Sequence, residues 1–70
     1  MSTATQEGAA AQCAVGFLLT RARMAWRAGQ WGVVYDCRQR IAAVWQEHPR
    51  AVPTWATARR VADFLAGDRP

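Results

Sequence analysis

Three stretches of the chain repeat apolar residues at intervals of three and four positions, which is the spacing of an amphipathic helix. The first stretch, residues 9–28, contains no proline and is rich in helix-forming residues. At about 100° per residue, one face of it carries Ala11, Val15, Leu18, Leu19, Ala22 and Trp26. The pattern predicts a buried face and a helix that ends at Gly29, because glycine readily adopts the left-handed conformation of a helix C-cap.

A second apolar face follows this glycine. Its members are Val34, Cys37, Ile41, Val44 and Trp45. They predict a helix over residues 31–47, with His48 at its end. On the polar side, Asp36 precedes Arg40 by four positions, the order that favours an ion pair along a helix.

Two prolines separate this helix from a third. Pro49 disfavours helical backbone at the residue before it, and Pro53 suits the first position of a new helix. We expect the third helix over residues 53–66, closed by Gly67. Its expected buried face is Thr54, Ala58, Val61, Ala62 and Leu65.

These elements predict an all-α fold, a small three-helix bundle, because no stretch shows the alternation of a strand. The domain organisation that we expect is a disordered N-terminus over residues 1–8, a single helical domain over residues 9–67 and a tail over residues 68–70.

Two of the four tryptophans lie on either side of the predicted turn. If the first two helices form an antiparallel hairpin about Gly29, Trp26 and Trp31 meet at its closed end. We expect both rings to fill the core there, since large aromatic side chains bury much area. The alternative makes Trp31 an exposed anchor for a partner, because tryptophan is enriched at binding hot spots.

The segment AWRAGQW, residues 25–31, with Val34, Ile41 and the later PRAVPTW, resembles a tetratricopeptide repeat over about 27 residues, Ala25 to Ala51. The chain departs from the repeat at Arg21 and Ala22, where a leucine-glycine pair is expected, and it has no second repeat. The resemblance implies a helical hairpin that leads into a third helix.

The composition and charge of the chain add two observations. Half of the 70 residues are hydrophobic (51%), too many for a disordered chain and a large share for so small an interior. Some apolar side chains must therefore lie at the surface, where they commonly meet a partner. The net charge is +4, and all nine basic residues are arginine. Arginine without lysine reflects either GC-rich coding, which favours a bacterial or phage origin, or the recognition of phosphate and carboxylate groups.

No segment has the pattern of an export signal, and the longest apolar run, AVGFLL, is far shorter than the roughly 20 residues that cross a bilayer. We therefore expect a cytoplasmic protein with no membrane partner.

The sequence offers little for catalysis. In the predicted hairpin Cys13 and Cys37 lie too far apart along the helices for a disulfide, and Cys37 falls on a buried face. Neither cysteine has the paired spacing with His48 that a metal site needs. The acidic residues are scattered and no glycine loop could hold phosphate, so we expect no enzyme, no cofactor, no metal and no small-molecule substrate.

A second apolar row on the first helix is the leading candidate for function. Cys13, Phe17 and Met24 lie about 180° from the centre of the buried face, and Arg21 and Arg27 flank them. The row predicts a surface for self-association or for another protein. Alternatively, the first helix packs between the other two, or the row is an idle surface.

Arg59 and Arg60 form the other candidate. They are either solvated, with Arg59 beside Asp63, or the contacts of a small helix-turn-helix-like DNA-binding regulator.

The first hypothesis for the function is a non-enzymatic protein–protein interaction module, an adaptor or an inhibitor of a host system. It forms a homodimer or binds another protein. The DNA-binding regulator is the alternative.

Overall fold

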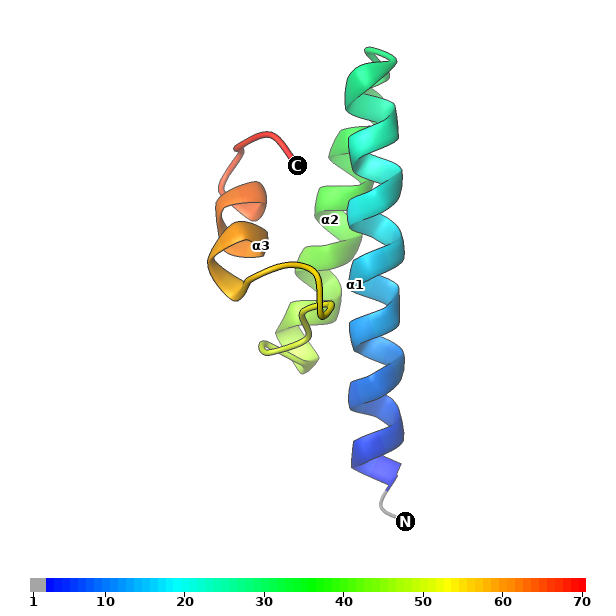
Figure 1. The fold of residues 1–70 in the computed structure, drawn as a ribbon, viewed down its shortest axis with the longest axis vertical. Coiled ribbons are helices and arrows are strands. Elements are labelled where there is room, and N and C mark those ends of the chain that lie inside the picture. The colour runs from blue at the N-terminus through cyan, green and yellow to red at the C-terminus, as the bar shows by residue number, and fades with distance from the viewer. Residues whose placement is uncertain (1–2) are drawn as a thin grey trace.

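A computed structural model describes residues 3–70, with side-chain exposure given from Gln6 onward. It contains three helices, α1 (Thr3–Arg27), α2 (Trp31–Glu47) and α3 (Ala58–Leu65), and no strand within that range. Helices α1 and α2 run antiparallel side by side, and the shorter α3 lies against α2 (Figure 1). The predicted all-α class and the number of helices are confirmed.

Two helix boundaries differ from the prediction. Helix α1 begins at Thr3, so the N-terminal segment that we expected to be disordered is helical from Thr3 to Gly8, while residues 1 and 2 lie outside the described range. Helix α3 begins at Ala58, five residues later than expected. The reason is Thr57, which has extended backbone and whose hydroxyl accepts the Arg60 N–H at 3.1 Å, a typical N-cap.

The turn between α1 and α2 forms as predicted at Gly29, whose φ is +69°. The Gln30 N–H donates to the Ala25 carbonyl at 2.8 Å, and the Gly29 N–H donates to the Trp26 carbonyl at 3.1 Å. This pair of bonds is a Schellman motif, which satisfies carbonyls that the end of the helix would otherwise leave unpaired.

The core lies mainly between α1 and α2, and α3 contributes two side chains to it. Its buried members are Ala11, Val15, Leu18, Leu19, Ala22, Ala25, Val34, Cys37, Ile41, Ala51, Val61 and Phe64. The predicted buried faces of the first two helices are confirmed except at Trp26, which is 38% exposed while Ala25 is buried, and at Val44 and Trp45, which pack half-buried against the core. For the third helix the prediction missed Phe64, one of the largest buried side chains. It also placed Thr54, Ala58 and Ala62 in the core, although all three are exposed and Thr54 lies before α3.

The segment over residues 48–57 covers one side of α1. The Gln12 side chain donates to the Val52 carbonyl at 2.8 Å, and the Trp45 indole N–H donates to the Ala51 carbonyl at 2.9 Å. A Cβ atom at Gly16 would lie 3.2 Å from the Pro53 Cβ, so the segment approaches α1 closely because residue 16 is glycine.

Helix α3 is held on α2 by Arg38. The Arg38 guanidinium lies 4.7 Å from the centroid of the Phe64 ring, and its Nε donates to the Phe64 carbonyl at 2.7 Å. After α3, Gly67 turns the chain with a φ of +110°, and the tail runs back toward the hairpin (Figure 1). Because α2 neighbours both other helices, the side of α1 that faces away from α2 and from residues 48–57 stays uncovered.

Candidate functional site

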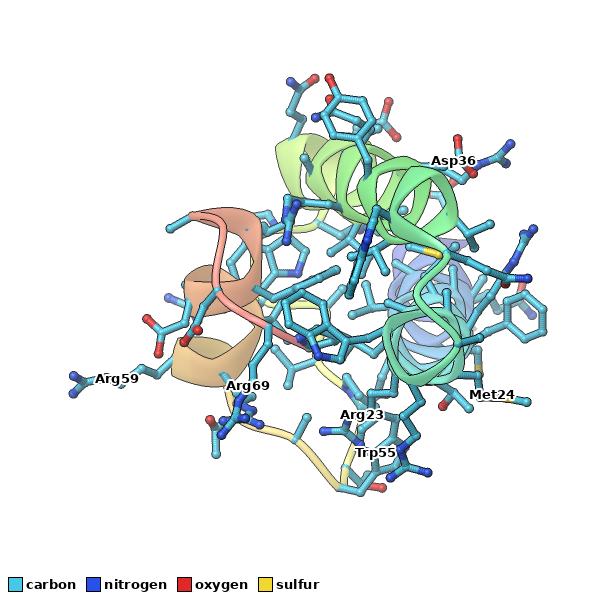
Figure 2. The ribbon with its side chains drawn as sticks, turned by 90° about the horizontal axis from the view of Figure 1, so that it is seen from above. Arg23, Met24, Asp36, Trp55, Arg59 and Arg69 are labelled. Carbon is cyan, nitrogen blue, oxygen red and sulfur yellow. The ribbon has the colours of Figure 1, made fainter. Side chains whose placement is uncertain are left out.

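The outer face of α1 is a row of exposed side chains, Ala10, Cys13, Phe17, Thr20 and Met24. Phe17 is 68% exposed and Met24 is 67% exposed, and Figure 2 places Met24 on the side of α1 away from α3. The structure therefore brings Cys13, Phe17 and Met24 together as predicted. It contradicts the alternative in which α1 packs between the other two helices, because α2 holds that position.

A groove runs beside this face, with a volume of about 480 Å³. Its walls are Gln12, Cys13, Gly16, Phe17, Thr20, Pro53, Thr54 and Trp55. Gly16 lies where Pro53 and the Trp55 ring approach α1, and Trp55 itself stays half exposed. The outer face of α1 thus combines a projecting aromatic ring, Phe17, with a hollow directly next to it.

The two arginines that were expected to flank the row have different surroundings. Arg21 is exposed on the side of α1 that faces α2, close enough to act on Cys37. Burial raises the pKa of the Cys37 thiol, while the charge of Arg21 opposes that rise. Arg27 is exposed in the last turn of α1 and borders a second cleft at the closed end of the hairpin.

At this closed end the two tryptophans meet, but they do not fill the core. Their ring centroids are 5.0 Å apart at an interplanar angle of 76°, an edge-to-face contact. Trp31 is 58% exposed, and Trp26 also keeps part of its ring exposed. The prediction that both rings fill the core is therefore wrong. It required other core side chains around Trp26, but at the last turn of α1 Trp26 faces Trp31 and an open cleft.

The paired arginines of α3 do not act as a pair. Arg60 lines the second cleft, while Arg59 points away from the bundle (Figure 2). No ion pair joins Arg59 to Asp63 within residues 3–70, where the one ion pair is Arg40–Asp36 at 2.8 Å, as predicted. Adjacent helical positions diverge by about 100°, so Arg59 and Arg60 point in different directions from α3, and the helix-turn-helix interpretation stays a prediction.

The second cleft, which we call the arginine cleft, has a volume of about 340 Å³ and is lined by Arg23, Trp26, Arg27, Arg60, Arg69 and Pro70. Sequence reasoning missed Arg23 and Arg69 as site residues. The spacing of Arg23 and Arg27, one helical turn apart, was a signal for the α1 half of the cleft. The position of Arg69 had no signal, because it depends on the turn at Gly67.

The remaining reactive groups are dispersed. Cys13 is an exposed free thiol, and Cys37 is a buried one, as expected of a small side chain on a core face. Within the described part of the chain no three histidine, cysteine or acidic side chains gather as a metal site would require. None of the three helices is long and apolar enough to cross a membrane, over the residues that the structure describes. The surfaces that stand out are thus an apolar face and a basic cleft, both suited to binding.

No family model, curated protein or solved structure matches this chain. Its function must therefore be inferred from its own surfaces.

Proposed function

We propose that this chain is a non-enzymatic protein–protein interaction module, of the adaptor or inhibitor class and of bacterial or phage origin, that self-associates through the outer face of α1. The observation that carries the proposal is the row Cys13, Phe17 and Met24, whose two large members are each about two-thirds exposed. Together with Ala10 and Thr20, the row repeats at alternating intervals of three and four residues, the spacing of a seam between paired helices.

The shape of this face favours a second copy as its occupant. Phe17 projects beside a groove of about 480 Å³. In a two-fold symmetric dimer the same patch of each subunit meets the other. Each Phe17 can then enter the groove of its mate, so that one surface supplies both the projecting ring and the hollow.

The charges along α1 favour an antiparallel pairing. The C-terminal half of the helix carries Arg21, Arg23 and Arg27, and the charged residue of the N-terminal half is Glu7. A parallel pair would bring the two basic halves near one another, where like charges repel. An antiparallel pair sets the basic half of each helix against the half that holds Glu7.

The surface area of the single chain supports an association of this kind. A folded monomer of 7.8 kDa exposes about 4,400 Å² by the usual scaling with mass. This chain exposes 4884 Å² and measures 42 × 20 × 17 Å, so it is extended for its size. Pairing along α1 would cover apolar surface that an extended shape leaves in water.

The test replaces both exposed apolar side chains with acids, in the variant Phe17→Glu/Met24→Glu. Burying two carboxylates in an apolar contact costs at least a few kcal/mol. We expect the parent to sediment as a dimer and this variant as a monomer with unchanged helical circular dichroism. The matched control is Tyr35→Glu/Ala43→Glu, which adds the same charge at two exposed positions of α2 and should remain dimeric.

Three results would contradict the proposal. A parent chain that is monomeric at its highest soluble concentration shows that the chain does not self-associate. A Phe17→Glu/Met24→Glu variant that stays dimeric shows that the outer face of α1 is not the interface. A variant that unfolds while the control folds shows that Phe17 and Met24 belong to the core.

A further inference from the structure

The arginine cleft brings together four guanidinium groups from three separate parts of the chain. Arg23 and Arg27 come from consecutive turns of α1, Arg60 from the first turn of α3 and Arg69 from the tail. In Figure 2, Arg69 lies between α3 and the position of Arg23. Four like charges around one hollow repel one another, and a bound anion relieves that repulsion.

The segment that carries Arg69 is fixed by hydrogen bonds. The Asp68 N–H donates to the Asp63 carbonyl at 3.0 Å, and the Gly67 N–H donates to the Phe64 carbonyl at 3.1 Å. Arg38 adds a bond to the Asp68 carbonyl at 3.3 Å. The backbone next to Arg69 is therefore held in place by the structure, so that the cleft exists before a ligand arrives.

None of these four guanidinium groups forms an ion pair within residues 3–70. The one ion pair of that range, Arg40–Asp36, lies on α2, outside the cleft. No carboxylate side chain lines the cleft. Each guanidinium therefore keeps its fork of N–H donors available, the geometry that binds the oxygens of phosphate in two-point contacts.

One exposed tryptophan, Trp26, lines the cleft. Trp26 forms part of its wall and touches the exposed ring of Trp31 edge to face, so that the faces of the two rings are directed differently. Arg23, three residues before Trp26 on α1, lies 4.8 Å from the centroid of the half-exposed Trp55 ring, which lies outside the cleft. Arginines for phosphates and aromatic faces for bases are the two elements of a surface that binds single-stranded nucleic acid.

We propose that the arginine cleft binds single-stranded nucleic acid, with its phosphates on Arg23, Arg27, Arg60 and Arg69 and a base stacked on Trp26. Single strands fit better than a duplex, because unpaired bases can reach a ring at the wall of a cleft of about 340 Å³, whereas stacked pairs cannot. Nucleic acid fits better than an acidic peptide, because the exposed tryptophans offer flat surfaces that carboxylate side chains do not use.

The test measures binding of a fluorescently labelled oligothymidylate of about 12 nucleotides by fluorescence anisotropy. The site variant is Arg60→Ala/Arg69→Ala. Its matched control is Arg50→Ala/Arg59→Ala, which removes the same net charge from two exposed arginines outside the cleft, one of them next to Arg60. Circular dichroism confirms that both remain folded, and Arg69→Glu against Arg50→Glu repeats the comparison with single changes, the first of them in the tail beyond α3.

We expect the site variant to lose about tenfold in affinity and the control to lose less than about threefold. The dependence of log affinity on log salt should become shallower by about 1.4 in the site variant, at about 0.7 for each phosphate neutralised. Trp26→Leu should weaken binding of the oligonucleotide and leave competition by pyrophosphate unchanged, because pyrophosphate has no base to stack.

Several outcomes would overturn the proposal. The first is that the parent does not bind the oligonucleotide. The second is an equal loss of affinity in the site variant and its control, which would indicate an effect of net charge alone. The third is that polyglutamate competes as well as an unlabelled oligonucleotide, which would indicate an acidic peptide ligand. A preference for duplex over single-stranded DNA would equally refute it.

Discussion

The contact between Arg38 and α3 gives the sharpest prediction about stability, through the substitution Arg38→Met. Methionine keeps the apolar stem and removes the guanidinium. The lost hydrogen bond to the Phe64 carbonyl is 2.7 Å long and involves a charged donor, a class that contributes about 1.5–3 kcal/mol. The lost interaction with the Phe64 ring contributes about 0.5–1 kcal/mol at a partly exposed site.

The lower end of these ranges applies, because the Phe64 carbonyl keeps the bond from the Gly67 N–H at 3.1 Å and is not left unpaired. We therefore expect Arg38→Met to lower the free energy of unfolding by about 2 kcal/mol, which corresponds to a fall in Tm of about 8–16 °C for a domain of this size. Urea and thermal unfolding followed by circular dichroism measure both. A loss below about 0.5 kcal/mol would refute the idea that Arg38 fixes α3. A double-mutant cycle with Phe64→Leu isolates the contribution of the ring.

Three further predictions concern burial. Trp26→Ala should lower the free energy of unfolding by about 1–2 kcal/mol, since more than a third of this residue is exposed. Phe64→Ala should lower it by about 3–5 kcal/mol and unfold much of the chain. Equal losses of stability in urea denaturation would contradict the assignment of Trp26 to the surface. A thiol reagent should modify Cys13 at once and Cys37 only on unfolding, and rapid labelling of both would be inconsistent with a buried Cys37. Because burial raises the pKa of Cys37 in the folded state, its contribution to stability is complete below the ordinary thiol pKa of 9.0 and is lost as the pH rises through the higher folded value. Urea midpoints should therefore fall above that pH, and a Cys37→Ala variant should show a smaller fall.

Local periodicity was sufficient to predict the two long helices. The buried faces of α1 and α2 and the turn at Gly29 depend on residues a few positions apart, and the structure confirms them. The exposure of Phe17 and Met24 was predictable for the same reason, since a helix that buries one face leaves the opposite one open. Whether a partner covers that face remains a prediction, as does the tetratricopeptide resemblance.

The errors arose at side chains whose neighbours in the fold are not determined by the local sequence pattern. Trp26 lies on the buried side by helical phase, but at the last turn of α1 its neighbours are Trp31 and an open cleft. Phe64 was missed because the third helix was phased from Pro53 instead of from its N-cap, Thr57. The arginine cleft was not predictable, because Arg23 and Arg69 meet only after the turn at Gly67 brings the tail back.

The mass of the unmodified chain in solution, measured by sedimentation equilibrium at low and at high salt, tests the self-association through α1 most directly. An interface of apolar side chains is weakened little by salt, whereas contacts between surface charges are screened. The account predicts twice the 7.8 kDa of one chain under both conditions. A mass of 7.8 kDa at every concentration, or a dimer that dissociates as salt is added, would contradict it.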